Sequence, residues 1–309
     1  MVGSAVARIL EQQGHTILGH RSAELDLRNQ LAVHEMMRNE QPDWVVVSAA
    51  KVGGIGANST YPADFIYDNL LIEANLIHAS HISGVERLIF LGSSCIYPRD
   101  CPQPMKEEHL LSGPLEATNR PYAVAKIAGI ELCASYNRQY GTRFLAAMPT
   151  NLYGPGDNYH LENSHVIPAL LRKMHEAKLA GEEKVLLWGS GTPLREFLYS
   201  EDLAEAIVFL LELPENTYNQ LSHNDQNSWP LINIGSGIEV SIAELASHIK
   251  QVVGYEGSIR WDTAQPDGTP RKRMDSSRIQ SLGWAPKTPL VEGLEKAYQN
   301  FLTSLSCVS

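Results

Sequence analysis

Tyr122 and Lys126 lie four residues apart in Arg-Pro-Tyr-Ala-Val-Ala-Lys, a spacing that places two side chains on the same face of a helix. Pro121 suits the first turn of such a helix. An ammonium beside a phenol favours the phenolate and lowers the tyrosine pKa. Ser93 stands upstream, at the end of a hydrophobic run, where its hydroxyl could bind the oxygen that the phenol protonates. Together the three residues predict an acid and a hydrogen-bond donor for carbonyl reduction or alcohol oxidation.

The spacing of Tyr122 and Lys126 alone has a simpler interpretation, namely a solvated lysine next to an aromatic residue at a helix start. Chains of this length often contain Tyr-x-x-x-Lys by composition alone. The chemistry therefore depends on the surrounding elements and motifs.

Composition narrows the class of protein. The chain has 309 residues, a net charge of −10 and no run of Lys or Arg, which makes nucleic acid an improbable partner. No apolar run approaches the length of a membrane span. We expect no signal peptide, because Met1-Val-Gly-Ser runs straight into a helical pattern. The cysteines, Cys95, Cys101, Cys133 and Cys307, have no metal-ligand spacing beyond a loose Cys95/Cys101 pair. We expect no metal, no disulfide framework, no membrane partner and a reducing, cytoplasmic compartment.

Short apolar runs alternate with helical patterns along the chain. The predicted strands are 15–19, 44–49, 87–92, 144–148, 184–188, 231–234 and 258–261. The predicted helices are 4–13, 29–39, 62–83, 121–140, 164–178, 201–213, 241–253 and 290–302. Runs such as Trp44-Val-Val-Val are apolar on both faces, as strands of a covered parallel sheet are.

This alternation predicts an α/β fold with a doubly wound, mostly parallel, Rossmann-like sheet. The alternation weakens after Pro155. We expect residues 1–155 to form a dinucleotide-binding domain. Residues 156–309 are expected to form mainly a smaller α/β substrate lobe, with some segments returning to the sheet.

The beginning of the chain is unusual for such a fold. In dinucleotide-binding folds the first helix follows a strand and a glycine turn, and its N-terminus holds the pyrophosphate. Here Gly3 and the helix 4–13 are present without that strand and the earlier glycines. We therefore expect that the first strand is missing and that Met1 corresponds to an internal loop methionine.

Several longer motifs carry a family resemblance. They are Ala49-Ala-Lys-Val-Gly-Gly-Ile, Gly92-Ser-Ser-Cys-Ile-Tyr-Pro, Pro149-Thr-Asn-Leu-Tyr-Gly-Pro, Asn163-Ser-His-Val-Ile-Pro, Trp188-Gly-Ser-Gly-Thr-Pro-Leu-Arg and Pro266-Asp-Gly-Thr-Pro-Arg-Lys. With Ser93 and Tyr122-Ala-Val-Ala-Lys126, they resemble the extended short-chain dehydrogenase/reductase family nearly end to end, in the branch that makes GDP-L-fucose. The resemblance implies NADPH-dependent conversion of GDP-4-keto-6-deoxy-D-mannose to GDP-L-fucose by 3,5-epimerisation and 4-keto reduction.

Epimerisation needs a base and an acid besides Ser93, Tyr122 and Lys126, because a proton leaves one face of C3 or C5 and returns to the other. By resemblance the pair is Cys95 and His165. A thiolate serves as base if its pKa is lowered or its proton can move away, and histidine titrates near neutrality. By residue type alone, Cys95 would be a small buried hydrophobe and His165 a polar residue at a helix start.

The resemblance also implies ligand contacts. Those for NADPH are Gly3, Arg21, Leu91, Gly92, Ser93, Ser94, Lys126, Pro149, Thr150, Asn151, Leu152 and His165. Arg21 is expected to follow the second strand, where an arginine favours a 2′-phosphate, although a solvated arginine is the alternative. Those for the GDP-sugar are Lys173, Trp188, Arg195 and Asp267, with Arg195 and Lys173 on diphosphate oxygens.

By family analogy the enzyme is a homodimer through helices 62–83 and 121–140. Two other functions stay open. One is another nucleotide-sugar epimerase or reductase with the same Ser, Tyr and Lys, although relatives that eliminate water carry an Asp-Glu pair where this chain has Ser94-Cys95. The other is a non-catalytic dinucleotide-binding protein, inactivated by a missing N-terminus.

Overall fold

A computed structural model describes residues 1–160, 164–223, 229–265 and 267–306. Asn163, Pro266 and Cys307, which entered the reasoning above, lie outside these ranges. The central sheet contains four parallel strands in the order β1-β2-β3-β7. Their bounds are β1 Trp44–Val47, β2 Arg87–Leu91, β3 Phe144–Pro149 and β7 Leu231–Ile234.

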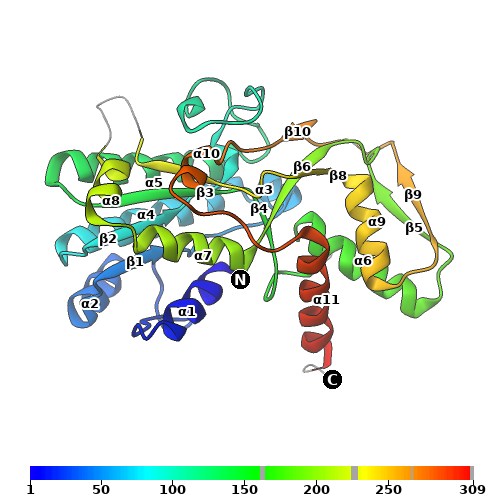
Figure 1. Ribbon diagram of the computed structural model, residues 1–309, viewed down its shortest axis with the longest axis horizontal. Helices are drawn as coiled ribbons and strands as arrows, with labels where there is room; N and C mark the ends of the chain where they lie inside the picture. The colour runs from blue at the N-terminus through cyan, green and yellow to red at the C-terminus, as the bar shows by residue number, and fades with distance from the viewer. Residues whose placement is uncertain (161–163, 224–228, 266, 307–309) are drawn as a thin grey trace.

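Helices cover both faces of this sheet (Figure 1). Alternate residues of β2 and β3 face opposite sides, because side chains of a strand alternate in direction. Ile89 and Leu145 pack with α1 (Val2–Gln12) and α7 (Ser200–Leu211), whereas the neighbouring strand residues pack with the helices of the other face. Those helices are α2 (Gln30–Glu40), α4 (Pro62–Ile82) and α5 (Arg120–Tyr140). The arrangement confirms the doubly wound α/β fold.

The second half of the chain builds a separate apolar cluster. This cluster contains α6 (Val166–Ala180), α9 (Ile242–Val253) and α11 (Leu290–Ser306), gathered at the right of Figure 1. The strands around it are β4 Asn151–Tyr153, β5 Lys184–Trp188, β6 Leu194–Tyr199, β8 Glu239–Ser241, β9 Ser258–Asp262 and β10 Arg271–Lys272. β5 pairs with β9, and β6 joins β4, β8 and β10.

Short elements complete the described structure: α3 Ile55–Thr60, α8 Glu215–Ser222 and α10 Ser277–Ser281, with single 3-10 turns at Ser94–Ile96 and Glu107–His109. α7 packs against the central sheet, and β7 is one of its strands, although both follow residue 156 in the chain. The exact division at residues 155 and 156 stays a prediction.

The predicted strand 15–19 is wrong. These residues form no strand, and their side chains are exposed, including Leu18 at 48%. A strand forms only where its backbone groups find a partner. The described part of the chain offers 15–19 no neighbouring strand, and β1 pairs on one side only, with β2. Arg21 therefore does not follow a strand.

No helix in the described ranges is long and apolar enough to cross a membrane. The same residues contain no group of His, Cys, Asp and Glu side chains arranged to hold a metal ion. Cys95, Cys101 and Cys133 are buried free thiols.

Candidate active site

The site lies at the carboxyl ends of β2 and β3, where doubly wound sheets bind their ligands. Leu91 ends β2, and the Gly92 N–H donates to the Ala147 carbonyl at 3.0 Å. A Cβ added to Gly92 would lie 1.9 Å from Cε of Met148. A larger residue at this position would therefore require the Met148 side chain to move.

Ser93, Cys95 and Tyr122 meet in this place. Ser93 begins the 3-10 turn, and its hydroxyl accepts the Cys95 N–H at 3.5 Å. The same hydroxyl hydrogen-bonds to the Tyr122 phenol and to the Cys95 thiol, and these contacts oppose the rise in pKa that burial causes in both groups. The turn after β2 and the first turn of α5 thus bring two predicted reduction residues, Ser93 and Tyr122, together with the predicted epimerisation residue Cys95.

The structure corrects the expected effect of Lys126 on Tyr122. Burial raises the Tyr122 pKa well above its ordinary value, and the charges of Cys95 and Glu73 raise it further. The Lys126 ammonium lies 5.8 Å from the centre of the Tyr122 ring and forms an ion pair with Glu73 at 2.9 Å. The phenol is therefore a neutral acid in this arrangement, ready to donate its proton rather than poised as phenolate.

Cys95 is also a neutral group at rest. Burial raises the pKa of its thiol, while the charge of Lys272 is the largest effect that lowers it. Lys272 lies on β10 in register with Arg195 on β6, so the two cations are neighbours across a strand pair. Burial lowers the pKa of both groups, and the charge of Arg195 lowers that of Lys272 further.

His165 precedes α6, an element that contributes none of the residues of the Ser93, Cys95 and Tyr122 cluster. His165 is exposed immediately before α6. Burial raises the pKa of Asp157, and the Asn158 N–H and His165 oppose that rise. Among the described contacts none joins His165 to Cys95. The structure thus brings four of the five predicted catalytic residues together and leaves His165 at the start of a neighbouring helix.

The predicted cofactor residues divide into two groups. Thr150 and Asn151 follow β3, and both side chains donate to the Glu196 carbonyl, at 3.1 and 2.9 Å. Gly3 lies inside α1 rather than before it, and an added Cβ would meet the Ser48 hydroxyl at 2.6 Å. The third glycine of dinucleotide-binding turns has this helix-to-strand packing role. The ends of β2 and β3 with the start of α1 therefore fit a dinucleotide, whereas Arg21 is an exposed loop residue.

The predicted sugar-nucleotide residues lie in the second half. Asp267 accepts the backbone N–H and the hydroxyl of Ser190, at 2.9 and 2.7 Å, which lowers its pKa. A Cβ added to the neighbouring Gly268 would lie 2.9 Å from Nη2 of Arg195, and the charge of Asp267 favours the ionised guanidinium. Burial lowers the Arg195 pKa. Arg195 and Asp267 are thus neighbours.

Trp188 ends β5 with 73% of its surface exposed, available to stack on a planar group. Lys173 on α6 donates to the carbonyl of Leu186 on the same strand, at 2.5 Å. Its ammonium is therefore directed at β5 in this structure, and no described contact joins it to Arg195.

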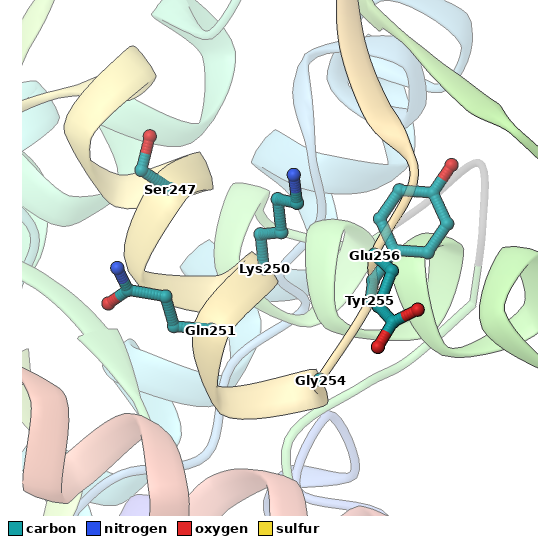
Figure 2. Close-up of a pocket in the computed structure, with 6 residues that line it drawn as sticks. All are labelled: Ser247, Lys250, Gln251, Gly254, Tyr255 and Glu256. Atoms are coloured by element: carbon teal, nitrogen blue, oxygen red, sulfur yellow. The ribbon is translucent and has the colours of Figure 1, made fainter.

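A cavity of about 410 Å³ lies elsewhere, at the end of α9 (Figure 2). Its lining residues are Ser247, Lys250, Gln251, Gly254, Tyr255 and Glu256. None of the predicted catalytic residues lines it, and it is therefore not the site described above.

Comparison with known proteins identifies the family of this chain. Residues 1–223 match the NAD dependent epimerase/dehydratase family. This chain belongs to that family.

Within this family, the chain is 54% identical to GDP-L-fucose synthase 1 of Arabidopsis thaliana, over 99% of this chain and 91% of the plant protein. It is also 54% identical to the GDP-L-fucose synthase of Escherichia coli (strain K12), over 98% and 94% of the two chains. A solved GDP-L-fucose synthetase from Naegleria fowleri bound to NADP superimposes with a TM-score of 0.84. Its identity is 27%, and the coverage is 99% of this chain and 92% of that one.

Sequence reasoning missed Glu73 and left Lys272 out of the site. Glu73 is the one charged residue within the apolar run Asn69-Leu-Leu-Ile-Glu-Ala-Asn-Leu-Ile of a predicted helix. A carboxylate in such a run is a signal for a buried ion pair. Lys272 carries no comparable signal, because its neighbours Arg195 and Cys95 are distant in sequence.

Proposed function

We propose that this chain converts GDP-4-keto-6-deoxy-D-mannose to GDP-L-fucose with NADPH, by epimerisation at C3 and C5 and reduction at C4. The observation that carries the proposal is the cluster of Ser93, Cys95 and Tyr122 at the carboxyl end of β2. A reductase needs only the hydroxyl and the phenol there. A thiol in the same cluster adds a group that can exchange a proton with carbon.

The epimerisation depends on the 4-ketone, which acidifies the C–H bonds at C3 and C5. The Cys95 thiol first releases its proton to solvent water, and the resulting thiolate, which the charge of Lys272 favours, takes the proton from carbon. His165 is the proposed acid that returns a proton to the opposite face.

In the reduction, bound NADPH supplies the hydride for C4. Tyr122 donates its phenolic proton to the C4 oxygen, and the Ser93 hydroxyl holds that oxygen in place. The raised pKa of Tyr122 keeps the proton on the phenol until the oxygen acquires charge. Thr150 and Asn151, tied to the Glu196 carbonyl, shape the cofactor side of the site.

Arg195 and Trp188 are the proposed contacts for the GDP part of the substrate. Arg195 can bind diphosphate oxygens in bidentate fashion, with Lys272 beside it, and Trp188 can stack on the guanine. Asp267 supports Arg195 by charge and is itself held by Ser190.

A homodimer through α4 and α5 is part of the proposal. Tyr67 and Ile82 on α4 are 63% and 60% exposed, and Val124 and Tyr140 on α5 also present apolar surface. Two such helices pack well against their own copies in a second subunit. Light scattering of the wild type and of Tyr67→Asp tests the interface, and the variant should be monomeric.

The decisive experiment for the activity is product analysis. Purified protein, NADPH and GDP-4-keto-6-deoxy-D-mannose should yield GDP-L-fucose, with solvent deuterium incorporated at C3 and C5. Turnover without incorporation would indicate a simple 4-reductase. NADPH binding without turnover of any GDP-4-keto sugar would favour the non-catalytic alternative.

A further inference from the structure

Glu73 is a buried carboxylate that none of the steps above uses. Its side chain is 1% exposed, and its Oε1 lies 2.9 Å from Nζ of Lys126, whose side chain is 2% exposed. Neither oxygen of Glu73 makes a hydrogen bond of good geometry in the described structure. The two residues therefore interact chiefly as buried opposite charges.

The surroundings of this pair are shaped to hold it. The Lys126 ammonium lies over the Phe90 ring, 4.6 Å from its centre, and beside the Tyr122 ring. A Cβ at Gly129 would lie 2.3 Å from the Phe90 ring and 3.0 Å from Oε2 of Glu73. The absence of a side chain at Gly129 thus makes room for the carboxylate and the aromatic ring together. Three elements, β2, α4 and α5, contribute to the enclosure.

Burial and the Lys126 charge have opposite effects on the ionisation of Glu73. Burial raises the Glu73 pKa to about 7, against the opposing attraction of Lys126. The charge of Glu73 in turn raises the pKa values of Tyr122 and Cys133. Among the described residues, the titratable neighbours of Glu73 are therefore Lys126, Tyr122 and Cys133, all on α5. A buried carboxyl in this position can gain or lose its proton near neutral pH, and its ionised form is the one that attracts Lys126.

We propose that Glu73 is a positioning residue for the reduction: its carboxylate anchors the Lys126 ammonium beside Tyr122, and its protonation releases that anchor. The inference rests on the proposed function, because it concerns the Tyr122 and Lys126 pair of the reductase. It makes the position of the Lys126 side chain dependent on pH through the ionisation of its Glu73 partner.

The first test is the pH profile of NADPH oxidation in single turnover. Wild-type rates should fall as the pH is lowered from about 8 to about 6, as the Glu73 carboxylate is protonated. Glu73→Gln should be roughly tenfold slower at the upper pH, with a flat profile at least around neutrality. Glu73→Asp, which keeps the charge, should restore part of the rate and the slope. A Glu73→Gln profile parallel to the wild type would overturn the proposal.

The matched control is Asp202→Asn, which changes another buried carboxylate. Asp202 accepts hydrogen bonds from the Thr288 N–H and hydroxyl and lies far from Lys126 in the fold. This variant should lose stability but keep the wild-type pH profile. If it flattens the profile as Glu73→Gln does, the effect is general destabilisation and the proposal is wrong.

A second readout requires neither substrate nor turnover. A carboxyl whose pKa is raised on folding contributes stability that is present below its unfolded-state pKa, 4.5. This contribution is lost as the pH rises through its folded-state pKa, about 7. The wild type should therefore lose thermal stability relative to Glu73→Gln across this interval. A constant difference in Tm would refute titration of Glu73 in the folded protein. A wild type that binds NADPH but does not turn over the GDP-sugar would contradict the proposed function alone, and the Tm series would still decide the role of Glu73.

Discussion

Glu196→Gln should destabilise the protein, because this buried carboxylate holds three distant segments together. Its Oε1 accepts the Gly237 N–H at 2.7 Å, and its Oε2 accepts the Met274 N–H at 2.9 Å. Burial raises the Glu196 pKa, and these two N–H groups oppose that effect. A glutamine amide has only one acceptor oxygen, so it would turn its NH2 group toward one of the two donors.

The magnitude follows from the unpaired donor. One buried N–H without its charged partner costs about 1.5–3 kcal/mol. The other N–H keeps an acceptor, but an uncharged one, and this weaker hydrogen bond adds to the cost. The variant also no longer buries a carboxylate charge, which offsets a similar amount of free energy. With an unfolding entropy of about 2.1 cal/mol/K per residue, a chain of 309 residues gives about 0.65 kcal/mol/K. The expected decrease in Tm is therefore about 2–5 °C.

The assay is thermal unfolding of Glu196→Gln beside Glu176→Gln. Glu176 forms an exposed ion pair with Arg172, one helical turn away, and its loss should shift Tm by less than about 1 °C. Glu196→Gln should also raise KM for the GDP-sugar more than for NADPH, because Lys272 lies two residues before Met274. Equal Tm values for the two variants would refute the reasoning.

Three further predictions address the chemistry. Tyr122→Phe should abolish hydride transfer while NADPH binding, measured by fluorescence titration, stays nearly unchanged, because the ring is kept and only the proton donor is lost. Reduction at the wild-type rate would remove Tyr122 from that role. Deuterium exchange at C3 and C5 should increase as the pH rises above neutrality, because burial raises the Cys95 pKa, and Cys95→Ser should suppress the exchange at every pH. An exchange rate that Cys95→Ser leaves intact would exclude the thiol as base. Arg195→Met should raise KM for the GDP-sugar by the equivalent of about 1.5–3 kcal/mol with little change for NADPH, and equal changes for both ligands would indicate a folding defect instead.

The sequence predicted most of the elements because their signals are local. Apolar runs such as Arg87–Leu91 and Phe144–Pro149 became the central strands. Helix ends were equally legible, for example Ser241 with Glu244 in a capping box at the start of α9. β6 was missed because Arg195 and Glu196 interrupt its apolar pattern. Its buried glutamate is tolerated only because residues 237 and 274 supply N–H donors.

The residue types of the site were likewise legible from sequence, since Ser93, Cys95 and Tyr122 stand in extended motifs. The ionisation states of these residues could not be predicted from the sequence. Sequence spacing placed Lys126 near Tyr122, but burial and the Glu73 carboxylate, which comes from another helix, decide that the phenol is neutral and the ammonium is paired. Desolvation and long-range charge depend on what the folded chain packs around a group. The sequence by itself therefore predicted which groups could carry the chemistry, and only the tertiary structure decided how they are buried and which partners surround them.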